Sequence, residues 1–394
     1  MTSKLPFDRS EFEARLRKVR ASMAAQELDL LILSDPCNFY YVSGYEAWSF
    51  YVQQYLIITA DEAARPIWLG REMDLRGARL TTWLDDADLH TYPDTYVQSA
   101  ERHPAQFLAA FLEARGWDNG RIGLEQQSYY LTAKTQLVLD AALPNATLVD
   151  ASLLVNWIRA VKSPAEIAWM SQAARIVENA MQTAVAHTRP GVRQCDVAGE
   201  IYRAMMRGAD GYGGQYTSSP PFMPSGERVD TPHLSWTDEP YAANGPANFE
   251  LMGSRLRYHT PLARTVFLGK PPQAMLDLEK AALDGIEAAL ATARPGVTAA
   301  DVEQAWQAAA GRHGVHKSAR CGYSIGIAYP PTVGELTISL RPEDRTVLEE
   351  GMTFHLMPAV WQSGASITIT EPFRITATGS ETFCQFDRRL IVID

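Results

Sequence analysis

The sequence predicts an α/β protein of two domains, and three observations lead to this prediction. In the first 160 residues, short apolar runs alternate with segments of helical periodicity, which is typical of an α/β domain. A strong helix-start signal follows at Ser163, where a second domain is expected to begin. Beyond it one motif occurs twice, which indicates two similar halves. The predicted domains are an N-terminal α/β domain at 1–160 and an internally duplicated domain at 161–394.

The N-terminal domain is expected to open with an amphipathic helix over residues 10–26. Apolar side chains recur there at helical spacing, at Phe12, Leu16, Val19 and Met23. Apolar runs then predict strands at 28–34, 55–59, 66–70 and 121–125, with a helix over 104–115. Strands separated by helices in this way predict a layered α/β domain of ordinary size.

Aromatic side chains are unusually dense between residues 38 and 51. One interpretation is the edge of a hydrophobic core. The other is a ring-lined wall over a binding site or a subunit contact, where tyrosine and tryptophan are enriched. In the second case we expect Trp48, Phe50 and Tyr51 to contact the substrate, from the same chain or from a partner subunit.

The second domain begins with a capping box. Ser163 is the expected N-cap, Pro164 stands at the first helical position, and Glu166 follows three residues after the cap. The motif Arg-Pro-Gly-Val-x-x-x-Asp-Val then begins at Arg189 and again at Arg294. Each copy follows a predicted helix and starts another, which gives four helices at 166–187, 196–206, 273–293 and 301–313. A duplicated domain of this kind places its site in the crevice between the halves.

Residues 247–269 predict a β-hairpin with charged and ring-bearing side chains. The arms are expected at 248–252 and 262–268, with the turn at Gly253-Ser254. Pro261 lacks a backbone N–H, so the second arm should be an edge or a bulge at that point. The loop before the hairpin contains His233, which can present an imidazole to it. This hairpin is the expected floor of an active site.

Composition narrows the class of partner. The formal net charge is −10 and the isoelectric point is near 5.4, which argues against nucleic acid and anionic membranes as partners. A small-molecule substrate is expected instead. No apolar stretch of signal-peptide or membrane-span length is present. The four cysteines are scattered without a CxxC pair, which favours reduced, buried thiols and a cytoplasmic protein.

The order of several motifs resembles the creatinase and methionine/Xaa-Pro aminopeptidase family. The motifs are Lys162-Ser-Pro-Ala-Glu-Ile167, the paired Arg-Pro-Gly-Val segments, Ser225-Gly226 with His233, Arg264-Thr265, Gly322-Tyr-Ser-Ile-Gly326, Glu350-Gly-Met352 and Glu371. The resemblance implies a creatinase-type N-terminal α/β domain and a pseudo-symmetric α+β domain of the "pita-bread" type. It also implies a homodimer.

The metallopeptidases of this family bind two metal ions through two Asp, one His and two Glu. The resemblance places these ligands at Glu250, Pro261, Tyr323, Met357 and Glu371. Proline has no donor atom, methionine is a soft ligand and tyrosine is protonated near neutral pH. No metal ion and no other cofactor are therefore expected.

The metal-free members cleave C–N bonds with histidine and glutamate side chains. Ala263 stands where creatinase carries an active-site glutamate, so it marks a lost or substituted catalytic position. Gly334 stands where creatinase has a substrate-binding arginine. The segments at 216–221, 233–238 and 322–331 instead resemble the ectoine hydrolases. That branch opens the cyclic amidine of ectoine, or of hydroxyectoine, to N-acetyl-2,4-diaminobutyrate.

The residues suit this chemistry. Water must attack the amidine carbon and a proton must reach the departing ring nitrogen, and histidine serves both steps, a role assigned to His233. Glu371 and Glu250 are expected to hold the amidinium cation, or to donate a proton if buried without a charge partner. Glu250 could instead pair with Arg264. Tyr323 and His259 are expected to contact the substrate, although histidines at hairpin turns are commonly exposed.

Three questions stay open at this point. The carboxylate of the substrate could be bound by Arg341, Arg374 or Arg255. A creatinase-like hydrolase of another small amidine or guanidino acid, or a metal-dependent Xaa-Pro peptidase, is the alternative enzyme. A binding module built on an inactive peptidase fold is the alternative without catalysis, and retention of both His233 and Glu371 argues against it.

Overall fold

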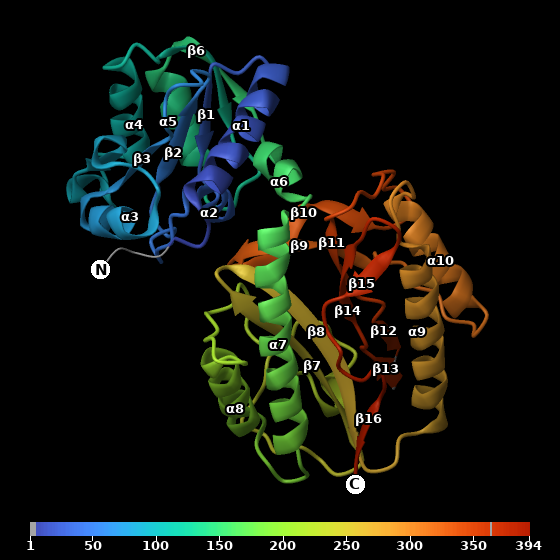
Figure 1. The fold of residues 1–394 in the computed structure, drawn as a ribbon. Coiled ribbons are helices and arrows are strands. Elements are labelled where there is room, and N and C mark those ends of the chain that lie inside the picture. Colours follow the sequence, from blue (N-terminus) through green and yellow to red (C-terminus); the bar gives the residue numbers. More distant parts are fainter. Residues whose placement is uncertain (1–4, 363–364) are drawn as a thin grey trace. The chain divides into compact units, whose positions relative to one another are not determined.

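The computed structural model describes residues 5–362 and 365–394 (Figure 1). The chain divides into two compact units, Met1–Arg159 and Ala160–Asp394. Each unit has hydrophobic core clusters of its own. Among the described helices, none is long and apolar enough to cross a membrane.

The first unit is built on a six-stranded mixed sheet with the order β4-β3-β2-β1-β5-β6. The strands are β1 (Leu30–Leu33), β2 (Tyr55–Thr59), β3 (Ile67–Arg71), β4 (Leu89–Tyr92), β5 (Asn119–Leu124) and β6 (Asn145–Asp150). The helices are α1 (Arg9–Ala25), α2 (Pro36–Ser43), α3 (Leu75–Thr81), α4 (Pro104–Glu113), α5 (Ala133–Ala142) and α6 (Leu154–Arg159). Leu30 and Ile32 of β1 pack with Leu108 of α4 and Leu139 of α5 in one core cluster. The predicted α/β domain is therefore confirmed.

The second unit contains the same series of elements twice. The first half has α7 (Pro164–His187), α8 (Gln194–Arg207), β7 (Gly245–Arg255) and β8 (Tyr258–Leu268). The second half has α9 (Gln273–Thr292), α10 (Ala299–Gly311), β9 (Gly322–Tyr329) and β10 (Thr332–Leu340). In Figure 1 the α7–α8 pair and the α9–α10 pair lie beside different parts of the sheet. The predicted pseudo-symmetric domain is confirmed, because each motif copy joins the two helices of its half.

An eight-stranded sheet joins the two halves. Its order is β15-β14-β11-β9-β8-β16, with β7 paired to β8 and β10 paired to β9. Its other strands are β11 (Thr353–Leu356), β14 (Glu371–Ile375), β15 (Ser380–Thr382) and β16 (Ile391–Ile393), while β12 (Val360–Gln362) and β13 (Ala365–Ile367) form a separate two-stranded sheet. The halves meet where Tyr258 of β8 pairs with Ile327 of β9. The sheet therefore brings the β7–β8 hairpin next to β9 and β11.

Helix α7 begins as the sequence predicts. The Ser163 hydroxyl accepts a hydrogen bond from the Glu166 N–H at 3.3 Å, and the Glu166 carboxylate accepts one from the Ser163 N–H at 2.9 Å. Pro164 occupies the first helical position, where its missing N–H has no partner to lose. The capping box thus fixes the start of the helix that packs on the hairpin.

The turn of the hairpin is not at Gly253-Ser254, so that prediction is wrong. Strand β7 continues through both residues to Arg255, and the turn is Leu256-Arg257, with φ of 47° and 65°. Consecutive left-handed residues form the tight turn that suits the twist of a hairpin. Gly253 is needed for another reason, because a Cβ there would lie 1.9 Å from the Ala173 carbonyl oxygen of α7. The glycine permits close approach of helix and sheet.

Pro261 lies in β8 without breaking its pairing with β7. The register is continuous from Arg255↔Tyr258 to Gly245↔Leu268, and Pro261 pairs with Met252. On its other edge, β8 pairs with β9 only at Tyr258 and with β16 only from Val266 onward. The missing N–H is therefore accommodated at a locally open edge, as the sequence predicts.

The four cysteines are free, but only two are fully buried. Cys321 and Cys384 are buried, whereas Cys37 and Cys195 are half-buried. The expectation of a buried structural role is thus confirmed for the first pair and wrong for the second.

Candidate active site

A cavity of about 550 Å³ opens in the second unit above the β7–β8 hairpin. Its lining comes from β7, from the loop before β7, and from the segment that leads into β9. The start of β10, the residue after β11 and β12 complete it. The lining residues that carry chemistry are His233, Glu250, Tyr323, Lys317, Arg320 and Trp361. Three predicted site residues, His233, Glu250 and Tyr323, are therefore brought together.

Glu250 is a buried carboxyl group without a cation beside it. Its side chain lies in the cavity lining, and the residue is 8% exposed. The backbone is fixed by two hydrogen bonds with Phe222, at 3.0 and 2.9 Å. Among the described residues no ion pair involves Glu250, and burial raises the pKa of its carboxyl to about 7. The group can therefore exchange a proton near neutral pH.

His233 lines the same cavity and contacts the same phenylalanine. Its imidazole lies edge-on to the Phe222 ring, with ring centroids 5.4 Å apart and an interplanar angle of 65°. Phe222 bridges to Glu250 through its backbone, so one residue contacts both groups. The histidine itself is exposed.

Tyr323 reaches the cavity from β9 and is held from behind by His355 of β11. The two residues are cross-strand partners, and the Tyr323 hydroxyl lies 3.0 Å from His355 Nδ1. Burial, followed by Arg320 and Arg264, lowers the pKa of His355 to about 3, so this imidazole is neutral. Burial and the nearby Glu250 raise the pKa of Tyr323 above its ordinary value. The phenol stays protonated and its orientation is fixed by a neutral histidine.

His259 is not among the residues that line the cavity, and its role in substrate binding stays a prediction. The residue is 0% exposed, and both ring nitrogens have backbone partners. Nδ1 lies 2.8 Å from the Arg257 carbonyl oxygen, and Nε2 accepts a hydrogen bond from the Ser218 N–H at 3.1 Å. Burial and Arg257 lower the pKa of His259 to about 3. This histidine ties the loop at Ser218 to the hairpin.

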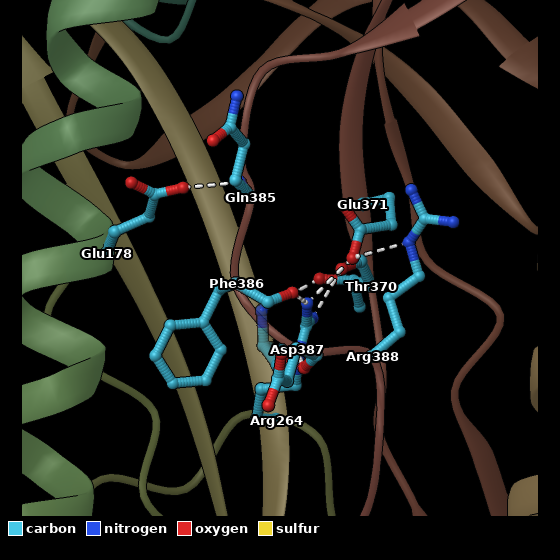
Figure 2. Close-up of polar contacts among 9 residues, drawn as sticks. Glu178, Arg264, Thr370, Glu371, Gln385, Phe386, Asp387 and Arg388 are labelled. Carbon is cyan, nitrogen blue, oxygen red and sulfur yellow. Dashed lines mark hydrogen bonds and ion pairs between the residues drawn. The ribbon is translucent and has the colours of Figure 1, made fainter.

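Glu371 is also outside the cavity lining, in a buried ion-pair network (Figure 2). Its Oε1 atom lies 2.7 Å from Arg264 NH2 and 3.2 Å from Arg388 Nε. Arg264 also donates to the carbonyl oxygens of Thr370, Phe386 and Asp387. Both guanidinium groups lie on Oε1, and Glu371 does not line the cavity, so its expected contact with the amidinium stays a prediction.

The same network settles the alternative assignment of Glu250. Arg264 is paired with Glu371 and not with Glu250. Ala263, which precedes it, is the cross-strand partner of Glu250, so Ala263 and Glu250 share a face while Arg264 starts from the opposite one. The proposed Glu250–Arg264 salt bridge is therefore wrong.

Ala263 lies beside the cavity but is covered. It is 0% exposed, and its backbone N–H donates to the Thr370 hydroxyl at 2.8 Å. Thr370 returns a hydrogen bond from its N–H to the Ala263 carbonyl oxygen at 3.2 Å. The role of Ala263 as a lost catalytic position stays a prediction.

Trp48, Phe50 and Tyr51 belong to the first unit. Trp48 is 57% exposed and Tyr51 is 62% exposed, while Phe50 is half-buried between Trp48 and Tyr130. Buried rings of the same segment, Phe39, Tyr40, Tyr41 and Tyr45, belong to the core. Part of the segment thus forms a hydrophobic core and part of it is exposed. The contact of its exposed rings with substrate stays a prediction.

Two cationic residues of the cavity were missed. Lys317 and Arg320 stand directly before the Gly322–Gly326 motif, which is the signal that could have pointed to them. The arginines proposed instead lie elsewhere: Arg374 pairs with Glu381, and Arg255 binds Gln172 and the Gly213 carbonyl oxygen. Neither those two nor Arg341 lines the cavity.

The residues at the five family metal positions do not fit a metal pair. Pro261 offers no donor, Met357 offers a thioether, and the Tyr323 phenol is engaged by His355. Glu371 is neutralised by two arginines, which leaves Glu250 alone. No group of three or more His, Cys, Asp or Glu side chains in residues 5–362 and 365–394 is arranged to hold a metal ion.

Comparison with known proteins identifies the family. Residues 168–377 match the model of metallopeptidase family M24, and residues 15–161 match the creatinase/prolidase N-terminal domain. An uncharacterized hydrolase/peptidase of Sinorhizobium fredii is 46% identical over 99% of both chains. The ectoine hydrolase of Halomonas elongata is 43% identical over 98% of both chains.

Solved structures of the family share the fold. A dipeptidase from Pyrococcus horikoshii superposes with a TM-score of 0.82 at 20% identity, over 96% of this chain and 100% of the dipeptidase. The chain is therefore a hydrolase of C–N bonds that belongs to the M24 family and carries the creatinase/prolidase N-terminal domain.

Proposed function

We propose that this protein opens the cyclic amidine ring of ectoine to give N-acetyl-2,4-diaminobutyrate, with hydroxyectoine as a second candidate substrate. The similarity to an ectoine hydrolase over nearly the whole of both chains supports this substrate. The chemistry of the cavity supports the reaction type. The observation that carries the proposal is Glu250, a cavity carboxyl with no cation of its own and a pKa near neutrality.

The amidinium cation of ectoine supplies the charge partner that Glu250 lacks. Its N–H groups can donate charge-assisted hydrogen bonds to the carboxylate. His233 takes a proton from the attacking water as the new C–O bond forms at the amidine carbon. The C–N bond of the ring then breaks, and His233 returns the proton that it took from the water to the departing nitrogen. One water is consumed, and an amide and an amine are formed.

The reaction proposed here needs no metal ion, because the side chains themselves move the protons. A binding module without catalysis is disfavoured by Glu250. Burial of a carboxyl without a partner is unfavourable unless a ligand or a proton compensates for it. The Xaa-Pro peptidase alternative is disfavoured by the loss of suitable ligands at Pro261 and Met357.

We also infer a cytoplasmic homodimer. The free cysteines are consistent with a reducing compartment. The exposed rings of Trp48 and Tyr51 are suited to a contact with a partner subunit, where they would close the pocket of the other chain. Light scattering tests the dimer, and the double variant Trp48→Ala/Tyr51→Ala is expected to weaken it.

The test is incubation with ectoine and detection of the ring-opened product by mass. We expect turnover that chelators do not abolish, and a loss of about 100- to 10,000-fold in His233→Asn and in Glu250→Gln. His313→Asn is the matched control, because this histidine pairs with Asp284 outside the cavity. Hydrolysis of Xaa-Pro dipeptides that responds to added metal would contradict the proposal.

A further inference from the structure

Two cations stand in the cavity with no anion beside them. Lys317 and Arg320 lie between α10 and β9 and line the same cavity as Glu250 and His233. The Lys317 ammonium donates to the Ala359 carbonyl oxygen at 2.8 Å, and Arg320 donates to the Ser339 hydroxyl at 3.0 Å. Both acceptors are neutral. Within the part of the chain that the structure describes, no carboxylate lies within ion-pair distance of either residue.

Aromatic rings hold both cationic groups in place. The Lys317 ammonium lies 4.3 Å from the centroid of the Trp361 ring, and the Arg320 guanidinium lies 4.5 Å from that of the Tyr323 ring. Trp361 and Tyr323 line the cavity as well. Rings stabilise a cation through their faces and leave its N–H groups available to a ligand. The two cations are therefore fixed in position while part of their hydrogen-bonding capacity stays unused.

The position of the cations relative to Glu250 gives the cavity two chemically different parts. Hairpin β7–β8 and the loop before it supply the carboxyl group and the imidazole, and the segment before β9 supplies the ammonium and the guanidinium. Tyr323 interacts with both parts, since Glu250 raises the pKa of its phenol and the Arg320 guanidinium lies on its ring. A ligand that carries one positive and one negative group is complementary to such a cavity.

We infer that Lys317 and Arg320 form a carboxylate subsite, which binds the carboxylate of the zwitterionic substrate while its amidinium faces Glu250. This inference rests on the proposed function for the identity of the substrate. Arg320 is suited to bind both carboxylate oxygens, and Lys317 adds a single point charge. Burial lowers the pKa of Lys317 to about 8, and a bound carboxylate would offset that loss of hydration.

Gly334 lies against the ring that carries Arg320. A Cβ at Gly334 would lie 3.3 Å from Cδ2 of the Tyr323 ring, closer than most real contacts. A side chain at 334 would therefore press on the ring on which Arg320 lies.

The experiment compares ectoine with its decarboxylated analogue, the same methylated cyclic amidine without the carboxylate. Steady-state kinetics are measured for the wild type, Lys317→Gln and Arg320→Gln. We expect each substitution to lower kcat/KM for ectoine by about 10- to 100-fold, mainly through KM, and to change that for the analogue by less than about threefold. Arg374→Gln is the matched control, because it removes an arginine outside the cavity.

A binding measurement separates this inference from the proposed function. Calorimetry with pipecolate, a cyclic amino acid that has a carboxylate and a ring nitrogen but no bond to hydrolyse, should give heat with the wild type and none with Arg320→Gln. If ectoine is not hydrolysed but pipecolate binding still depends on Lys317 and Arg320, the subsite stands and the proposed function fails. If ectoine is hydrolysed and the substitutions affect both substrates equally, the subsite is wrong.

Discussion

Two buried glutamates, Glu250 and Glu371, stand in opposite environments. Glu250 is in the cavity wall and has no cation beside it, and its pKa is raised to about 7. Glu371 is away from the cavity lining, with Arg264 and Arg388 on the same oxygen atom. Burial raises the pKa of Glu371 as well, but here the guanidinium groups oppose the effect.

The comparison shows that two buried carboxyls of one domain can serve different purposes. Glu250 lines the cavity, where a carboxyl with a raised pKa is suited to proton transfer. Glu371 belongs to the scaffold, since its partner Arg264 joins β8 to Thr370 and to the carbonyl groups of Phe386 and Asp387. The two residue types are the same, so only their neighbours determine the role.

The largest effect on stability is expected from Arg264→Met. This substitution leaves the buried Glu371 carboxylate with Arg388 alone and leaves three carbonyl oxygens without their donor. Breaking a buried pair by removing one partner typically lowers the free energy of unfolding by about 3–5 kcal/mol. Urea denaturation followed by circular dichroism measures the change.

The double variant Arg264→Met/Glu371→Leu is its control. Because it removes both charges, it should recover part of the lost stability, although the carbonyl oxygens stay without a donor. A double variant that is less stable than Arg264→Met would show that the ion pair is not the main contribution.

Glu250→Gln should act on stability in the opposite sense. The wild-type carboxyl titrates near 4.5 in the unfolded chain and near 7 when folded, so the unfolded state loses its proton first as pH rises. Wild-type stability is therefore lost between about pH 4.5 and 7, by roughly 3 kcal/mol in total. The variant has no such titration. Its stability relative to the wild type should rise across this window, as thermal unfolding at several pH values would reveal.

Glu371→Gln provides the contrast within the same experiment. It removes the anion that faces two arginines, so it should destabilise the protein at neutral pH. If both glutamine variants shifted stability in the same direction, the distinction between the two carboxyls would be wrong.

Local signals in the sequence predicted most of the fold. The capping box at Ser163 and Glu166 and the repeated Arg-Pro-Gly-Val segments depend on neighbours a few residues apart, and both are found as predicted. The hairpin turn was misplaced because Gly253 is required by the Ala173 carbonyl of a distant helix, which no local pattern reveals. A glycine selected by packing is indistinguishable in sequence from a glycine selected by a turn.

The candidate site was predictable only in part, for the same reason. His233, Glu250 and Tyr323 were found through motifs. The partners of Glu371 were not, since Arg264 precedes it by 107 residues and meets it only in the folded sheet. The partner of His259 was not found either, because the Ser218 N–H that occupies its second nitrogen comes from another loop. Burial and long-range partners decide which polar residues serve the site.

Ala263→Glu tests two opposed expectations. Comparison with creatinase predicts a gain of activity by orders of magnitude, because it restores a glutamate of that family. The structure leads us to expect a loss, since Ala263 is fully buried and pairs directly with Glu250. Overpacking typically lowers stability by about 1–3 kcal/mol, and a second carboxyl would raise the pKa of Glu250 further. Turnover of ectoine and the unfolding midpoint, measured for Ala263→Glu and the wild type, distinguish the expected gain from the expected loss. Ala263→Gln is the uncharged control.

Tyr323→Phe should have the smallest effect on activity. It tests the role of the Tyr323 hydroxyl, which belongs to the residue that interacts with both parts of the cavity. It keeps the ring under Arg320 but removes the hydroxyl that contacts His355 and the cavity. The loss of one hydrogen bond corresponds to about a tenfold decrease in kcat, with little change in KM because the cation–ring contact is retained. His355→Leu should reproduce this decrease by freeing the phenol, whereas His355→Gln, whose amide can still bind the hydroxyl, should restore most of the activity. Equal activity in His355→Leu and His355→Gln would mean that the histidine fills space and does not orient Tyr323.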